Sequence, residues 1–271
     1  MRSRITAAPY LLWAVLFIVI PLVLVAVFAF TNTGGGFTLE NFKNSADYAP
    51  VIFNSIWLSM IATAICLVIA YPLAYVISRR SAGSQRTMIM LIMLPMWMNF
   101  LLRTYAWMTL LENNGLINKL LGFLGLGPFE MINTQGAVVL GMVYNYLPFM
   151  ILPLYSVMVK IENSLVEAAS DLGCSASDTM KHVLLPLSMP GVTTGIIMVF
   201  VPSVSTFVIS RMLGGGSFML IGDLIEMQFL GNAYNPNLGA AISMVLMFII
   251  LICMALTNLF KDPEEKEGLL L

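Results

Sequence analysis

Residues 167–186 (EAASDLGCSASDTMKHVLLP) bring charged, small and turn-forming side chains together in a chain that is 59% hydrophobic. Ser164 and Glu167 have the S-x-x-E spacing of a capping box, which predicts a short helix from about Leu165. The apolar positions of this helix recur at i, i+3, i+4 and i+7 and form one face: Leu165, Ala168, Ala169 and Leu172. Half of this face is alanine, so a partner can approach it closely. The residue types on this face therefore favour the binding of a partner protein.

A glycine separates this helix from a second one. Gly173 suits the left-handed conformation that ends a helix, and Ser175 with Asp178 repeats the capping-box spacing. The second helix is expected to run to about Val183, with Pro186 and Pro190 marking its end. Such a helix–glycine–helix element could transmit the movement of a partner to the apolar segment that follows. Alternatively, the glutamate only caps, the glycine only turns the chain, and the helix lies on a lipid surface.

Polar residues inside the apolar segments are the second set of candidates, since polar groups at membrane depth usually face a partner helix or a cavity. The candidates for lining a passage are Asn99, Arg103, Tyr105, Trp107, Tyr144, Asn145, Ser203, Ser205 and Thr206. Pro95, Asn99, Arg103 and Trp107 are spaced by four and are expected to share one helical face. Arg103 is an unpaired cation well inside an apolar segment. It is expected to pair with carbonyls or with an acid on a partner chain.

Several of these groups also have plainer explanations. Tyr105 and Trp107 could offer cation–π surface to an amine, or form an aromatic belt near the membrane interface. The serine and threonine hydroxyls could coordinate ammonium groups, or only pack helices together. Asp223 and Glu226, at i and i+3, could guide a cation or meet an external protein, or form a solvated face. Glu112 could do the same, or only cap a helix end.

The sequence offers no catalytic constellation. It contains no HExxH motif, no P-loop and no pair of carboxylates within an apolar segment, and its single histidine, His182, lies in the polar segment. Cys66, Cys174 and Cys253 are too far apart in sequence to indicate a metal or disulfide framework. The net charge of -1 gives no support for nucleic-acid binding.

The elements that must position these residues are membrane spans. Only 10% of the residues are charged and the mean hydropathy is +0.90, which is typical of a membrane protein. Six segments are long and apolar enough to cross a bilayer: about Tyr10–Phe30, Ile56–Ser78, Met88–Leu111, Ala137–Val159, Gly191–Met212 and Gly239–Phe260. The first follows two arginines, but it is too long for a signal peptide and is expected to remain as a span.

The basic residues predict the orientation of these spans, because cytoplasmic loops carry an excess of lysine and arginine. With both termini inside, nine of the 13 basic residues are cytoplasmic: Arg2, Arg4, Arg79, Arg80, Arg86, Lys160, Lys181, Lys261 and Lys266. The expected fold is therefore all-α and polytopic, N-in and C-in. Its parts are residues 1–55 (first span and external loop), 56–260 (core, with the polar loop 161–190 in the cytoplasm) and 261–271 (a tail expected to be disordered).

Residues 167–186 follow a definite spacing: Glu-Ala-Ala, three residues, Gly, nine residues, an aliphatic residue, one residue, and Leu-Pro. This spacing resembles the cytoplasmic coupling loop of ABC-type import permeases. Residues 94–111, 112–118 and 213–230 are similar to the spermidine/putrescine permease family, and the similarity covers about 54–260. The resemblance implies a type I importer fold in a bacterial cytoplasmic membrane. The residues it implies for coupling to an ATPase are Glu167, Ala168, Ala169, Asp171, Gly173, Leu185 and Pro186.

The resemblance also implies partners. These are a second, related permease, two copies of a cytoplasmic ATPase and an extracytoplasmic polyamine-binding protein. ATP and magnesium would bind the ATPase, and no cofactor is expected on this chain. An acidic residue or proline expected near Ser210 is missing, which leaves substrate detail open. The alternatives are the same machine with another cargo (iron, thiosulfate or molybdate), and an ATP-independent carrier or membrane enzyme. Ion-driven carriers usually have mid-span acids, and none occurs here.

Overall fold

The computed structural model describes residues 9–32, 34–216, 218–231 and 233–259, and these are almost entirely helical. Within them, β-structure is limited to one bridge between Thr31 and Phe37. The elements are η1 (Val15–Val19), α2 (Ile20–Phe30), α3 (Glu40–Ser45), η2 (Ala46–Tyr48), α4 (Ala49–Ser78), α5 (Ala82–Met93), η3 (Leu94–Trp97), α6 (Phe100–Leu111), α7 (Leu116–Phe123), α8 (Gln135–Met158), α9 (Asn163–Asp171), α10 (Ala176–Thr179), η4 (Met180–Leu184), α11 (Leu185–Ser205), α12 (Val208–Leu213), α13 (Ile221–Leu230) and α14 (Pro236–Leu259).

Membrane-spanning helices dominate this architecture, as predicted. In the described part of the chain, five continuous helical stretches are long and apolar enough to cross a membrane: Pro9–Phe30, Glu40–Ser78, Gln135–Met158, Ala176–Ser205 and Pro236–Thr257. A bent pair, Ala82–Trp97 with Phe100–Phe123, makes up to six. The prediction of an all-α, polytopic fold is confirmed. The orientation remains a prediction, and the predicted tail 261–271 lies outside the described residues.

The third span is not the continuous helix that the sequence predicted. Its two halves are bent by 88° at a break, where Met98 is extended (φ -74°, ψ 150°). Asn99 sits at this break and caps α6: its side-chain oxygen accepts from the N–H groups of Leu101 (2.8 Å) and Leu102 (3.3 Å). The sequence predicted that Pro95, Asn99, Arg103 and Trp107 share one helical face. Because of the bend, this prediction is wrong. Pro95 lies before the bend, in the 3₁₀ turn η3.

The fifth span also differs from its predicted bounds. The helix runs continuously from Ala176 to Ser205, so Pro186 and Pro190 do not end it. A proline ring crowds the carbonyl four residues earlier and lacks an N–H. Here the π-helical turn η4 ends two residues before Pro186, and its wider i→i+5 bonding accommodates the ring. The polar segment is thus joined to the span by unbroken helix.

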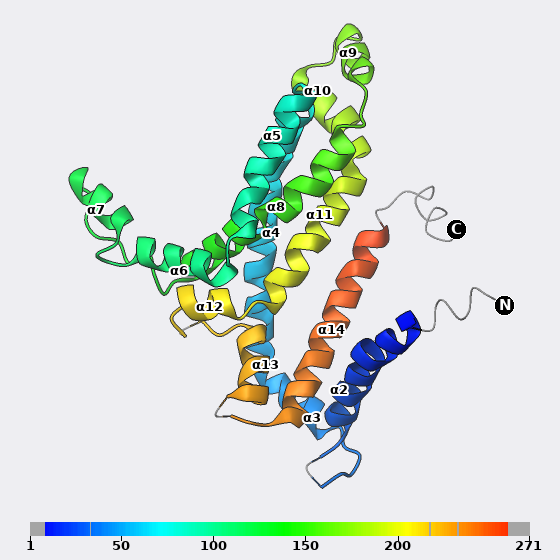
Figure 1. Cartoon of the computed structure of the whole chain (residues 1–271), viewed down its shortest axis with the longest axis vertical. Helices are drawn as coiled ribbons and strands as arrows, with labels where there is room; N and C mark the ends of the chain where they lie inside the picture. Colours follow the sequence, from blue (N-terminus) through cyan, green and yellow to red (C-terminus); the bar gives the residue numbers. More distant parts are fainter. Residues whose placement is uncertain (1–8, 33, 217, 232, 260–271) are drawn as a thin grey trace, which may run out of the picture.

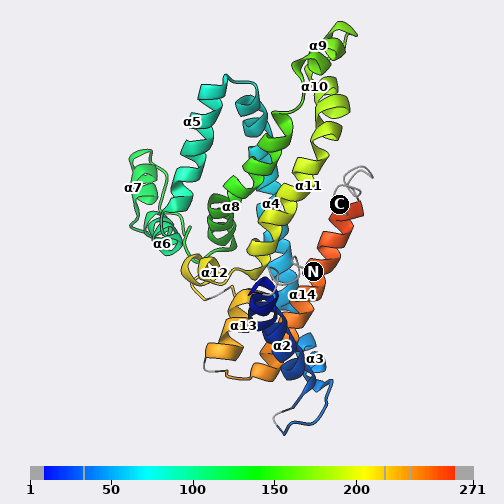
Figure 2. The same cartoon turned by 45° about the vertical axis from the view of Figure 1, so that its right-hand side comes forward.

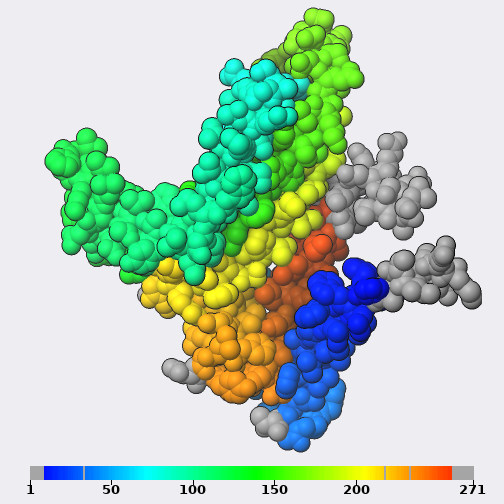
Figure 3. Space-filling model, in the orientation of Figure 1, coloured from blue at the N-terminus to red at the C-terminus, as the bar shows by residue number. Residues whose placement is uncertain are grey.

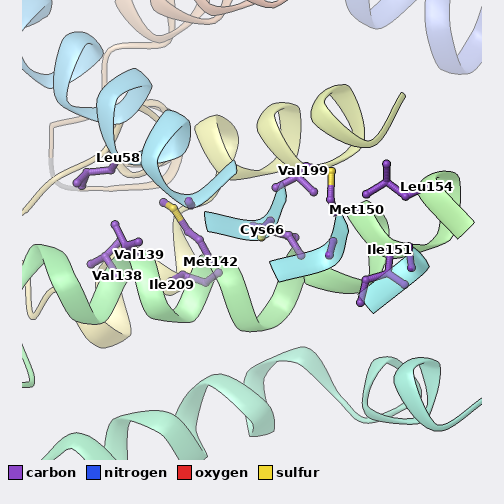
Figure 4. Close-up of a cluster of buried hydrophobic side chains, with 14 of the residues drawn as sticks. Leu58, Cys66, Val138, Val139, Met142, Met150, Ile151, Leu154, Val199 and Ile209 are labelled. Carbon is purple, nitrogen blue, oxygen red and sulfur yellow. The ribbon is translucent and has the colours of Figure 1, made fainter. Parts of the chain in front are cut away.

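Helices α4, α8 and α11 pack on one another and form the main core. Four small residues spaced by four, Ala62, Cys66, Ala70 and Ala74, are fully buried along α4, so neighbouring helices approach closely there. Gly195 gives α11 a similar approach, since a Cβ there would lie 2.6 Å from the Met150 sulfur on α8. Figure 4 shows Cys66 of α4, Met150 of α8 and Val199 of α11 in this core.

A second group of helices lies beside this core. Helix α14 packs against α2, α3 and α13 (Figure 1). Figure 2 shows the pair α9 and α10 at one end of the molecule, with α3 and α13 toward the other. In the space-filling view, α7 forms the tip of an arm that projects away from the body (Figure 3). The fold therefore separates the predicted docking element from the segments predicted to be external.

Candidate functional site

Helix α9 stands at one end of the molecule and carries most of the predicted docking residues (Figure 1). It begins at Asn163, two residues before the predicted start, so Ser164 already lies in its first turn. The Ser164 hydroxyl donates to the Glu162 side chain (3.0 Å). The predicted capping box between Ser164 and Glu167 is therefore wrong, because the helix starts too early for Ser164 to be its cap.

The predicted glycine turn and the predicted start of the second helix are confirmed. Gly173 has a φ of +82° and follows the end of α9, where the Cys174 N–H donates to the Ala169 carbonyl (3.0 Å). Ser175 and Asp178 form the predicted capping box at the start of α10, with 2.6 Å between the hydroxyl and the carboxylate. These hydrogen bonds from Ser175 lower the pKa of Asp178. Both turns fix the angle between α9 and α10.

The predicted apolar face of α9 exists and is largely uncovered. Of its four residues, Ala169 is buried, whereas Leu165 is 46% exposed and Leu172 is 85% exposed. The other predicted coupling residues are also exposed: Glu167, Ala168, Asp171, Gly173, Leu185 and Pro186. A solvent-facing leucine next to small and acidic side chains is a surface that can bind a protein partner.

Arg79, at the end of α4, ties α9 to a third helix of the core. Its Nη1 donates to the Ile161 carbonyl (2.9 Å) and to the Asn163 side chain, at the start of α9. Its guanidinium also lies over the Tyr75 ring, 5.3 Å from the centroid. No spacing pattern in the sequence indicates this link, although Arg79 directly follows the predicted span Ile56–Ser78. Helix α9 is thus connected to α8 and α11 through the chain and to α4 through Arg79.

The predicted passage residues on α6 and α8 fall into separate environments. Arg103 is 8% exposed, and its Nε has no hydrogen-bond partner among the described residues. Trp107 contacts Tyr144 edge to face, with 5.4 Å between ring centroids, whereas Tyr105 is 55% exposed. Asn145 is buried, donates to the Gly141 carbonyl (2.9 Å) and leaves its own oxygen unpartnered. Among the predicted passage residues, two buried polar atoms therefore remain without a partner in the described structure: Arg103 Nε and the side-chain oxygen of Asn145.

The predicted residues at the end of α11 are divided between core and surface. Ser203 is fully buried and donates to the Val199 carbonyl of its own helix (2.7 Å). Ser205 is exposed, and Thr206 is buried just after the helix ends. In this structure, Ser203 lies in the packed interior.

The acidic residues of the predicted external segments are also arranged differently from one another. Glu112 is exposed and occupies the C-cap position of α6. Asp223, in the first turn of α13, is only 6% exposed, so a solvated face is the wrong description of it. Its Oδ2 lies 2.5 Å from the Ser210 hydroxyl and accepts from the Leu220 N–H (3.0 Å).

Arg211, on α12, lies between Asp223 and Glu226. Its Nε is 4.0 Å from Asp223 Oδ1, and its two terminal nitrogens donate to Glu226, one of them at 3.2 Å. Arg211 lowers the pKa of Glu226, whereas burial raises the pKa of Asp223. Sequence spacing does not pair these residues, because 12 or more positions separate Arg211 from either acid. The opposite charges of Arg211 and the two acids were the only feature of the sequence that could have indicated the pairing.

The family and the relatives of the chain agree with this architecture. Residues 78–262 match the family profile of the binding-protein-dependent transport system inner membrane component. The chain is 38% identical over 258 residues to the spermidine/putrescine transport system permease protein PotB of Haemophilus influenzae, covering 92% of this chain and 90% of that protein. It is 35% identical to the PotB protein of Escherichia coli over 248 residues, covering 88% and 90%.

Solved structures show the same fold. A bacterial ABC transporter involved in the import of the acidic polysaccharide alginate superposes with a TM-score of 0.79 at 16% identity, covering 96% of this chain and 97% of that one. The alginate transporter in complex with an alginate pentasaccharide-bound periplasmic protein gives 0.78 at 15% identity, covering 94% and 92%.

Proposed function

The chain belongs to the family of binding-protein-dependent transport system inner membrane components, and we propose on this premise that it is a polyamine permease. It would form part of the transmembrane passage of an ABC importer that carries spermidine or putrescine into the cytoplasm. The cargo is assigned from the sequence identity of 35–38% to PotB permeases, which extends over about nine-tenths of the chain. The structure supports the machine through the exposed docking helix α9.

The partners follow from the same premise. They would be a second, related permease, a dimeric ATPase that binds α9 from the cytoplasm, and an extracytoplasmic polyamine-binding protein. ATP and magnesium would be held by the ATPase, so this chain supplies movement and a passage rather than chemistry. N-in and C-in orientation, which places α9 in the cytoplasm, is part of the proposal.

The structure indicates how the movement would spread. An ATPase that shifts α9 acts on α11 through the continuous helix of α10 and η4, and on α8 through the short connection before α9. It also acts on α4 through the hydrogen bonds of Arg79. These three helices form the main core, so a displacement of α9 is expected to change how the core opens to either side.

Arg103 completes the proposal with a contact to the second permease. A buried charge is costly unless it is paired. No acidic group in the described residues forms a salt bridge with Arg103, whose exposed fraction is only 8%. We assign its counter-charge to an acidic side chain of the second permease. An arginine would repel a cationic cargo, so a pairing role fits better than contact with the polyamine.

A competition experiment tests the cargo. The complete transporter is reconstituted in vesicles, and uptake of labelled spermidine is measured with excess putrescine, ferric ion, thiosulfate, molybdate or an amino acid. Inhibition by putrescine and not by the other compounds supports the proposal. If the loaded binding protein stimulates ATP hydrolysis but no spermidine is taken up, the machine stands and the polyamine cargo is refuted.

A further inference from the structure

Helices α12 and α13 and the residues between them line an open cavity of about 270 Å³. Both helices lie away from α9, with α13 farther from it than α12 (Figures 1 and 2). The polar wall of the cavity is formed by Ser210, Arg211 and Asp223, and its apolar wall by Phe218, Met219 and Met227. A cavity of this size lies at the lower limit for small-molecule sites, so it suits one end of an aminoalkyl chain rather than a whole triamine.

Two described residues at the end of α12 and just after it contact the segment that precedes α8. Leu213, at the end of α12, accepts a hydrogen bond from the Asn133 N–H (2.9 Å). Gly215 has a φ of +59°, and a Cβ there would lie 2.1 Å from the Asn133 side-chain oxygen. The glycine loop is thus seated on the segment before α8, and no larger residue would allow this seating.

The charges around the cavity do not balance. Arg211 supplies one positive charge, and Asp223 and Glu226 together supply two carboxylates. Arg211 contacts Glu226 closely but remains 4.0 Å from Asp223, and its side chain is half exposed. Asp223 is buried and held in place by Ser210 and the Leu220 N–H. An incomplete neutralisation of this kind favours a further cation beside a fixed carboxylate.

We propose that this cavity is an ammonium subsite on the route of the cargo, and that Arg211 occupies the place that an arriving ammonium group takes. The ammonium would donate to Asp223 and Glu226, and the guanidinium would swing out toward solvent. Phe218, Met219 and Met227 line the same cavity and would contact the methylene chain. The inference rests on the proposed polyamine cargo and adds the groups that receive it.

The proposal predicts opposite effects for the two partners of one ion pair. Glu226→Gln and Asp223→Asn remove acceptors of the ammonium and should each weaken spermidine binding by about tenfold, as expected for a charge-assisted hydrogen bond. Arg211→Met removes the competing cation and should tighten binding by about threefold to fivefold, the effect of an exposed ion pair. An ion pair that only fastens α12 to α13 would instead respond in the same direction to loss of either partner.

The test measures equilibrium binding of labelled spermidine to the transporter in nanodiscs, without the binding protein. Glu40→Gln is the matched control, since Glu40 is an exposed carboxylate in the first turn of another helix, α3, and the affinity of this variant for spermidine should stay at the wild-type value. Arg211→Lys keeps the positive charge and should stay within about twofold of wild type. Thermal unfolding of each variant identifies misfolded samples, and Arg211→Lys provides the folded comparison if Arg211→Met is lost.

The outcomes separate this inference from the proposed function. Weaker binding in both acid variants with tighter binding in Arg211→Met supports the subsite. Shifts in one direction for all three variants, or no shift, overturn it. ATP-dependent spermidine uptake by the wild-type transporter is measured in parallel, after the same purified protein has been reconstituted with its binding protein in closed vesicles. Absence of this uptake refutes the polyamine cargo itself, whereas normal uptake with same-direction shifts refutes the subsite alone.

Discussion

Leu172 offers a direct test of the docking role of α9. It is 85% exposed in this chain, on the predicted apolar face, and follows the last residue of the helix. A leucine so exposed contributes little to the stability of the permease, but it would contribute to a partner that covers it. Leu172→Ala removes three carbon atoms, worth about 0.8 kcal/mol each when buried, so the loss is about 2 kcal/mol. That corresponds to an ATPase affinity about 30-fold weaker.

The assay measures the dissociation constant of the ATPase for the permease pair in nanodiscs, together with thermal unfolding of the permease. Leu124→Ala is the matched control, because Leu124 is 74% exposed and lies just after α7, on the projecting arm (Figure 3). We expect weaker ATPase binding for Leu172→Ala only, and unchanged unfolding for both variants. Equal affinity of the two variants would refute the docking role of this face.

Three further predictions concern the helices around α9 and the core. Arg79→Ala removes hydrogen bonds from a charged donor, worth about 1.5–3 kcal/mol. Spermidine uptake should therefore fall about tenfold or more, while binding of the ATPase is retained. A parallel loss of uptake and ATPase binding would contradict a role of Arg79 in transmitting movement. Gly222→Ala places a Cβ 2.5 Å from the Ser205 carbonyl and should destabilise the permease by about 1–3 kcal/mol in thermal unfolding. Gly83→Ala, with open space around its Cβ, is the control, and equal unfolding of these two variants would count against the packing argument. Arg103→Leu should leave the isolated subunit at least as stable as wild type, yet weaken capture of the second permease about tenfold or more; unchanged capture would exclude the proposed ion pair.

Most of the fold could be predicted from the sequence because membrane spans leave a strong local signal. Runs of about 20 apolar residues located the spans, and Gly173 with the Ser175–Asp178 pair located the turn between α9 and α10. These features depend on neighbouring residues only. The sequence also contains the pattern of buried small residues on α4, because Ala62, Cys66, Ala70 and Ala74 are spaced by four.

The features that were missed depend on competition between local preferences or on distant contacts. The break in the third span arises where Asn99 caps a new helix, and apolar character alone does not distinguish a cap from a passage residue. The π turn before Pro186 keeps a helix intact where proline normally ends one. The pairing of Arg211 with Glu226 requires α12 and α13 to fold back on each other, which no spacing rule predicts.

The central claim is that this chain forms part of an ATP-driven polyamine importer. Its most direct test is the initial rate of labelled spermidine uptake into proteoliposomes that contain this subunit, the second permease and the ATPase, with the binding protein outside. Lumenal ATP with magnesium should produce uptake, and a non-hydrolysable ATP analogue or an imposed proton or sodium gradient should not. Uptake driven by the gradient in the absence of ATP would contradict the account.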